Sequence, residues 1–175
     1  TAREAAMRHK MYVTFMAKPM AREPGRAMHI HQSIVERKTR RNIFSDPDGK
    51  PSSLFYSHVA GLQKYLPGAM ALFAPNVNSY RRITRHSSAP INTHWGHDNR
   101  TAGLRVPVAG PENRRIENRV GGADANSYLA IAASLACGYL GMIEGLNPSE
   151  PIAGSAYDLP FSLARSLEES LRLLR

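Results

Sequence analysis

The stretch at residues 25–33, Gly-Arg-Ala-Met-His-Ile-His-Gln-Ser, places the tightest constraint on the fold of this chain. Successive side chains of an extended strand point to opposite faces. The hydrophobic side chains Met28 and Ile30 would then face a core, and the polar side chains His29, His31 and Ser33 would share the other face. Two imidazoles and a hydroxyl together indicate either a binding site or an ordinary solvated face. The rest of the chain must supply the partners that decide between them.

Arginine dominates the charge of the chain. Lysine and arginine number 23 against 14 acidic residues, a formal net charge of +9, and only five of the 23 are lysines. The planar guanidinium fork matches phosphate and carboxylate oxygens. The alternative is a generally basic surface. We do not expect a nucleic-acid partner, because the basic pairs lack interleaved aromatic residues.

Cysteine content and hydropathy bear on the compartment. The single cysteine, Cys137, allows no internal disulfide and favours a reducing, cytoplasmic setting. The most apolar run, residues 128–143, has 16 residues and is interrupted by Gly138 and Gly141. A membrane span needs about 20 apolar residues, so we interpret this run as a buried helix and expect no membrane contact.

Periodicity divides the chain into strands and helices. Residues that alternate with a period of two predict strands, and apolar residues spaced by three and four predict helices. Strands are predicted at residues 10–17, 25–35, 91–95, 103–108 and 114–120, and helices at 55–66, 69–73, 124–145 and 162–175. The short link between the first two strands suggests that they pair. The expected fold class is α+β, with an antiparallel sheet and helices packed on its outer face.

The strand at residues 114–120 carries a second cluster of polar side chains. Arg115, Glu117 and Arg119 would share one face, as either a salt-bridge ladder or a charged wall of an active site. With His29 and His31, Glu117 is the best candidate ligand for a divalent cation such as Mg²⁺ or Mn²⁺. A metal and several arginines without an obvious nucleophile are typical of phosphoryl transfer. The further arginines in this set are Arg82, Arg100 and Arg105.

Several motifs together resemble one enzyme family. They are Phe-Met-Ala-Lys-Pro at residues 15–19, Met-His-Ile-His-Gln-Ser at 28–33, Ala-Pro-Asn-Val-Asn-Ser-Tyr-Arg-Arg at 74–82, Asn-Arg-Thr-Ala-Gly-Leu-Arg-Val-Pro at 99–107 and Arg-Arg-Ile-Glu-Asn-Arg at 114–119. Their order and spacing over residues 10–146 resemble the C-terminal catalytic domain of the glutamine synthetase superfamily. Within it, the chain is most similar to the γ-glutamylputrescine synthetase-like γ-glutamylamine ligases.

The resemblance implies a role for each matching residue. His29 and Glu117 match metal ligands, for Mg²⁺ or Mn²⁺. The positions that match ATP contacts are His31, Ser33, Arg100, Arg105 and Arg115. The positions that match the glutamate site are Gly25, Arg82 and Arg119, and the catalytic positions are Arg82, Arg100 and Arg119.

The resemblance also implies a reaction and its partners. ATP would phosphorylate the γ-carboxylate of glutamate, and an amine would displace the phosphate. Ser88 stands where ammonia-using members carry an acidic residue, which favours an amine over ammonia. The alternatives are a glutamine synthetase proper, a non-catalytic binding or regulatory protein of the same fold, and a His-x-His metal hydrolase.

The resemblance implies an assembly as well. Residues 1–175 would be part of a single catalytic domain, truncated at both ends and without the small N-terminal β-grasp domain of the family. The implied protein is a homo-oligomer with sites between subunits. We expect this fragment to be inactive alone.

Overall fold

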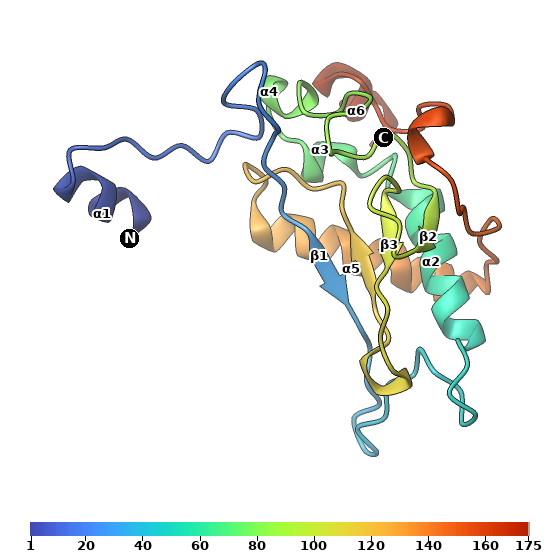
Figure 1. The fold of residues 1–175 in the computed structure, drawn as a ribbon. Coiled ribbons are helices and arrows are strands. Elements are labelled where there is room, and N and C mark those ends of the chain that lie inside the picture. Colours follow the sequence, from blue (N-terminus) through green and yellow to red (C-terminus); the bar gives the residue numbers. More distant parts are fainter. Residues whose placement is uncertain (175) are drawn as a thin grey trace.

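A computed structural model describes residues 1–174 and has an α+β architecture (Figure 1). Short strands form one sheet, and the two longest helices lie against it. The elements in chain order are α1 (Ala2–Arg8), β1 (Ile30–Gln32), α2 (Ser53–Tyr65), α3 (Met70–Phe73), α4 (Val77–Tyr80), β2 (Trp95–His97), β3 (Leu104–Val106), the 3₁₀ turn η1 (Pro111–Asn113), β4 (Ile116–Asn118), α5 (Ser127–Glu144), the 3₁₀ turn η2 (Ala156–Asp158) and α6 (Leu167–Leu173).

The sheet has the strand order β1-β4-β3-β2. Strand β4 is antiparallel to β1 and to β3, whereas β2 and β3 run parallel. The predicted α+β class is therefore confirmed, and the predicted antiparallel pairing holds everywhere except at the β2–β3 edge. Glu117, in the middle of β4, lies opposite His31 on β1 and Arg105 on β3.

The predicted strand at residues 10–17 does not form. This segment forms no strand, and Tyr12 is fully exposed. A single backbone hydrogen bond, from the Arg26 N–H to the Ala17 carbonyl oxygen (2.7 Å), joins its end to the second predicted strand. In Figure 1 it links α1, which stands away from the rest of the molecule, to the body of the chain. The predicted pairing of the first two strands is therefore wrong, and β1 pairs with β4 instead. Alternation identifies the two faces of a strand but carries no information about its partner.

Other predicted boundaries also move, and most of the strands are shorter than predicted. The strand predicted at residues 91–95 begins only at Trp95, as β2. The helix predicted at residues 162–175 begins at Leu167, because the Ser166 hydroxyl accepts a hydrogen bond from the Glu169 backbone and caps α6. The last predicted residue of that helix, Arg175, lies outside the described residues.

Close helix packing brings α2 and α5 together behind the sheet. A Cβ atom on Gly61 of α2 would lie 2.7 Å from the Cα atom of Gly141 on α5, so only glycine permits this approach. A buried polar chain then joins α5 to the sheet. The Asn118 amide donates to the Ser134 hydroxyl (2.9 Å), which donates to Gln32 (2.6 Å). These contacts hold the outer faces of β1 and β4 on the helix.

Helix α5 is only half buried, contrary to the prediction that it lies inside the core. Its small residues Ala130, Ala133 and Gly138 face the protein, whereas Tyr128 is 85% exposed and Ile143 is 64% exposed. Among the described residues it is the one helix long and apolar enough to cross a membrane by length and composition. A helix that is apolar all round does not reveal which of its faces has a partner.

The α2–α5 contact contains a buried histidine, which predicts a pH-dependent stability. His58 is fully buried, and its ring nitrogens have no hydrogen-bond partner in the described part of the chain. Burial lowers the pKa of His58 from 6.5 to about 4. The unfolded chain therefore binds a proton that the folded chain rejects, and stability should fall as the pH drops from 6.5 to 4. The total loss should be about 3 kcal/mol.

Urea unfolding measured between pH 7 and pH 4 would test this prediction. His58→Leu should remove the part of the pH dependence of the unfolding free energy that His58 causes, because leucine does not titrate. His9→Leu, at an exposed histidine, is the matched control and should leave the dependence unchanged. If the unfolding free energy changes equally with pH in the wild type and in His58→Leu, the pH dependence does not come from His58.

Candidate active site

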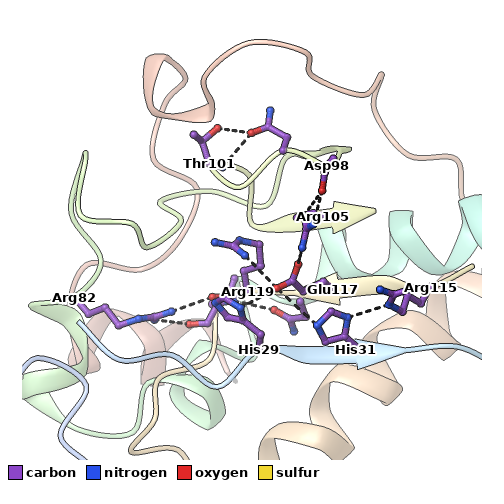
Figure 2. Close-up of polar contacts among 12 residues, drawn as sticks. His29, His31, Arg82, Asp98, Thr101, Arg105, Arg115, Glu117 and Arg119 are labelled. Carbon is purple, nitrogen blue, oxygen red and sulfur yellow. Dashed lines mark hydrogen bonds and ion pairs between the residues drawn. The ribbon is translucent and has the colours of Figure 1, made fainter. Parts of the chain in front are cut away.

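Glu117 is the centre of the site (Figure 2). Its side chain is only 3% exposed. The Oε1 atom lies 2.8 Å from His29 Nδ1 and accepts a hydrogen bond from Arg119 Nη1 at 3.1 Å. The Oε2 atom accepts from Arg105 Nη1 at 2.8 Å. Burial alone would raise the pKa of Glu117, but the hydrogen bond from Arg105 and the charge of Arg119 outweigh it and lower the pKa.

The strand register explains why these groups meet. His31 and Arg105 lie directly opposite Glu117 on the two neighbouring strands, and cross-strand neighbours share a face. His29 precedes His31 by two residues and therefore joins the same face. His31 Nε2 lies 3.8 Å from Glu117 Oε1. The structure thus brings together both predicted histidines and the predicted carboxylate.

His29 and Glu117 have the chemistry of metal ligands. Burial and the charge of Arg119 lower the pKa of His29, against the opposing effect of Glu117, and this favours the neutral imidazole. A neutral imidazole and an ionised carboxylate suit Mn²⁺ or Mg²⁺. Within residues 1–174, no group of three or more His, Cys, Asp or Glu side chains meets the requirements of a metal site. These two residues would therefore hold part of a coordination sphere.

Two further predicted ATP contacts, Arg105 and Arg115, touch this cluster. Arg115 Nε donates to His31 Nδ1 at 3.3 Å and does not pair with Glu117. Arg105 is shared between Glu117 and Asp98, which accepts from Arg105 Nε at 2.9 Å. Ser33 is exposed just beyond the end of β1. Arg115 therefore lies on the face that it was predicted to share with Glu117, but the guanidinium groups that pair with Glu117 are those of Arg105 and Arg119.

Arg82 is buried next to the cluster, and the partly buried Gly25 packs against its side chain. Arg82 is 3% exposed, and its guanidinium donates to the carbonyl oxygens of Val120 (2.8 Å) and Arg119 (2.9 Å). Burial lowers the pKa of Arg82 to about 10, so the side chain is still charged at pH 7. A Cβ atom on Gly25 would lie 2.8 Å from the Arg82 side chain. Arg82 thus positions the backbone that carries Arg119.

Arg100 and Arg119 line a cavity of about 560 Å³, and Arg119 also donates a hydrogen bond to Glu117. The sequence singled out Ser88, which also lines this cavity, but missed three other lining residues: His86, Thr101 and Tyr157. The available signal for His86 was its place in a long irregular segment, because such segments inside compact domains are often functional. Asp98, the second partner of Arg105, was also missed.

A buried carboxylate among guanidinium and imidazole groups, beside an arginine-lined cavity, is typical of sites that bind metals and anionic oxygens. Comparison with known proteins identifies the family. The profile of glutamine synthetase, catalytic domain, matches residues 1–175. The chain belongs to the glutamine synthetase family, whose members are ligases.

Individual relatives agree with this assignment. Gamma-glutamylputrescine synthetase PuuA of Escherichia coli (strain K12) is 43% identical over 164 residues, which cover 92% of this chain and 34% of the relative. Glutamate–isopropylamine ligase of a Pseudomonas species is 40% identical over 97% of this chain and 37% of its own length. A solved structure, apo GmaS without ligand, matches with a TM-score of 0.85 at 32% identity, over 98% of this chain and 40% of that one. The chain spans little more than a third of these curated relatives.

Arg82→Lys should destabilise the fold, because an ammonium cannot bind both carbonyl oxygens as the guanidinium does. Losing one buried, charged hydrogen bond should lower the free energy of unfolding by about 2 kcal/mol. Arg81→Lys, at the exposed neighbouring arginine, should change it by less than about 0.5 kcal/mol. Urea unfolding of both variants would measure the difference. Equal stabilities would show that the two carbonyl contacts contribute little.

Proposed function

We propose that this chain belongs to an ATP-dependent ligase that joins the γ-carboxylate of glutamate to an amine through a γ-glutamyl phosphate. The observation that supports this most is that Arg119 connects the His29–Glu117 pair to a cavity that it lines together with Arg100. Both named relatives are called amine ligases, for putrescine and for isopropylamine. The resemblance of the motifs points to the same reaction.

In the first step, a γ-carboxylate oxygen of glutamate attacks the γ-phosphorus of ATP, and the bond from that phosphorus to ADP breaks. Negative charge spreads over the oxygens of the transferring group. Arg119 is fixed by Glu117 at 3.1 Å and keeps other donors for these oxygens. Arg100 is exposed on the cavity wall and can close on the same group. Preorganised cations of this kind lower the barrier to charge development.

In the second step, the amine nitrogen attacks the carbonyl carbon of the acyl phosphate. The new C–N bond forms as the C–O bond to phosphate breaks, and the nitrogen gives up one proton to water. The products are a γ-glutamyl amide and inorganic phosphate. Arg119 and Arg100 would stabilise the leaving phosphate, because the same oxygens carry the charge in both steps.

The nucleotide and the metal would lie on the β1–β4 side of the site. A bound Mg²⁺ or Mn²⁺ would neutralise phosphate charge, with His29 and Glu117 among its ligands. Arg115 and His31, joined at 3.3 Å, and the exposed Ser33 would face the nucleotide. Arg105 is already paired with the Glu117 carboxylate. It would therefore hold that carboxylate in place as well as contact phosphate.

We further propose that the active enzyme needs protein beyond this chain, from the same subunit or from a neighbouring subunit of a homo-oligomer. His29 and Glu117 leave a metal undercoordinated. The outer face of α5 and the extended segment near Tyr12 expose apolar side chains that a larger assembly would cover. The chain alone should therefore be inactive.

Glu117→Gln, in the protein that carries this chain, should lower metal-dependent ATP turnover at least about 100-fold, because it removes a ligand charge and an arginine partner. Phosphate release with glutamate and an amine present, measured over a range of Mg²⁺ concentrations, would test this. The Mg²⁺ concentration for half-maximal rate should also rise.

Glu112→Gln is the matched control. Its carboxylate is exposed on η1, where Asn113 is its hydrogen-bond partner, and its turnover should match the wild type. Thermal melting would establish that both variants fold. If folded Glu117→Gln turns over normally, Glu117 serves only in a salt-bridge ladder. The proposed function would then lose its main support.

A further inference from the structure

Arg105 joins two carboxylates that come from different parts of the sheet (Figure 2). Its Nη1 atom donates to Glu117 Oε2 at 2.8 Å. Its other edge faces Asp98, where Nε donates to Oδ1 at 2.9 Å and Nη2 donates to the same oxygen. The guanidinium is thus held on both sides, and the arginine side chain is only 17% exposed. The proposed function uses Glu117 as a metal ligand and gives Asp98 no role.

The chain holds Asp98 in a defined turn. Asp98 follows the last residue of β2, and its backbone N–H donates to the Val106 carbonyl oxygen at 2.9 Å. Its φ angle of 48° lies in the left-handed region, which aspartate and asparagine adopt more readily than most residues. The side chain of the next residue, Asn99, donates to the Gly154 carbonyl oxygen at 2.8 Å. These bonds fix the turn that brings the Asp98 carboxylate to Arg105 on β3.

The groups linked by these hydrogen bonds are balanced in charge. Glu117 accepts from both Arg105 and Arg119, so this one carboxylate faces two positive charges. Asp98 adds a second negative charge, because the hydrogen bond from Arg105 lowers the pKa of Asp98 and keeps it ionised at neutral pH. An excess of positive charge beside Glu117 would repel a divalent cation, since charges interact strongly at short range in a partly buried site. Asp98 therefore favours the binding of a cation next to Glu117.

The same contact also orients the Glu117 carboxylate. Arg105 Nη1 binds Oε2, whereas Oε1 lies 2.8 Å from His29 Nδ1, the other candidate metal ligand. An arginine that is held at one edge only could rotate away from Oε2. Removing a group that orients a metal ligand typically lowers metal affinity by about 10- to 100-fold. Asp98 lies one contact further from the ligand, so its effect should be smaller.

We propose that Asp98 is a positioning residue for the metal site and that it acts through Arg105. The inference rests on the proposed function, which assigns His29 and Glu117 to a divalent cation. Asp98 holds the guanidinium against Glu117 Oε2 and balances its charge, and it needs no contact with the metal or with a substrate. The Asp98 side chain is 53% exposed, and exposed ion pairs contribute little to stability. Its removal should therefore change metal binding and leave the fold intact.

Asp98→Asn removes the charge, keeps the size of the side chain and suits the left-handed backbone conformation. In the protein that carries this chain, free of nucleotide, the Mn²⁺ site that Glu117→Gln weakens should have a Kd at least threefold higher in Asp98→Asn. The electron paramagnetic resonance signal of free Mn²⁺ measures this binding without turnover. Asp48→Asn, at an exposed aspartate of another turn, is the matched control and should leave the Kd unchanged. Thermal melting should be the same in both variants and the wild type.

Arg105→Gln tests whether Asp98 acts through this arginine. In that background, Asp98→Asn should change the Kd for Mn²⁺ less than twofold, because the contact is already lost and solvent screens the exposed carboxylate.

Binding of ADP in the presence of EDTA provides a second readout. Asp98→Asn removes a negative charge beside Arg105, so it should bind ADP at least as tightly as the wild type does. A general loss of structure at the site would instead weaken the binding of both ADP and Mn²⁺.

The outcomes distinguish the inference from the function on which it rests. If the wild type and Glu117→Gln bind Mn²⁺ equally, the metal site and the proposed function both fail. If Glu117→Gln weakens Mn²⁺ binding and Asp98→Asn does not, the proposed function stands and Asp98 forms an ordinary surface ion pair. The inference is also wrong if Asp98→Asn keeps its full effect in the Arg105→Gln background, or if it weakens ADP and Mn²⁺ binding to the same extent.

Discussion

The ionised side chain of Glu117 is the interaction on which the rest of the site depends. A buried carboxylate is costly unless cations and hydrogen bonds surround it. Here the partners are His29 from the segment before β1, Arg105 from β3 and Arg119 from the residue after β4. Removing one cationic partner would leave the buried carboxylate less well compensated. The cluster therefore links three segments of the sheet and concentrates ligand-binding groups at the same place.

Much of this cluster follows from sequence, because the strand period is two and does not depend on the partner strand. Alternation alone places His29 with His31, and it places Glu117 with Arg119. The sequence does not show which arginines pair with Glu117. Arg105 pairs with it, and Arg115 does not, because of the register of β3 against β4. That register is set by contacts between residues far apart in the chain.

Burial was harder to predict than secondary structure. The 18 residues of α5 are apolar on every side, so the sequence pattern does not indicate which face of the helix is buried. The structure buries the face rich in alanine and glycine. Glycine at residues 61 and 141 decides this face, because a larger side chain would prevent the contact with α2. The adjacent arginines 81 and 82 show the same difficulty, because the sequence does not distinguish them. Arg81 is exposed, whereas Arg82 is buried.

Arg82 contacts two parts of the site, one through its guanidinium and the other through its backbone carbonyl oxygen. Its guanidinium binds the carbonyl oxygens of Arg119 and Val120, and its own carbonyl oxygen accepts from Ser87 in the loop that carries His86. One buried residue thus links the backbone that carries Arg119 to the loop that carries His86, and both of these residues line the same cavity. An arginine in this position can shape that cavity without lining it. Its role in a reaction would therefore be to position other groups, even where its place in a motif suggests direct contact.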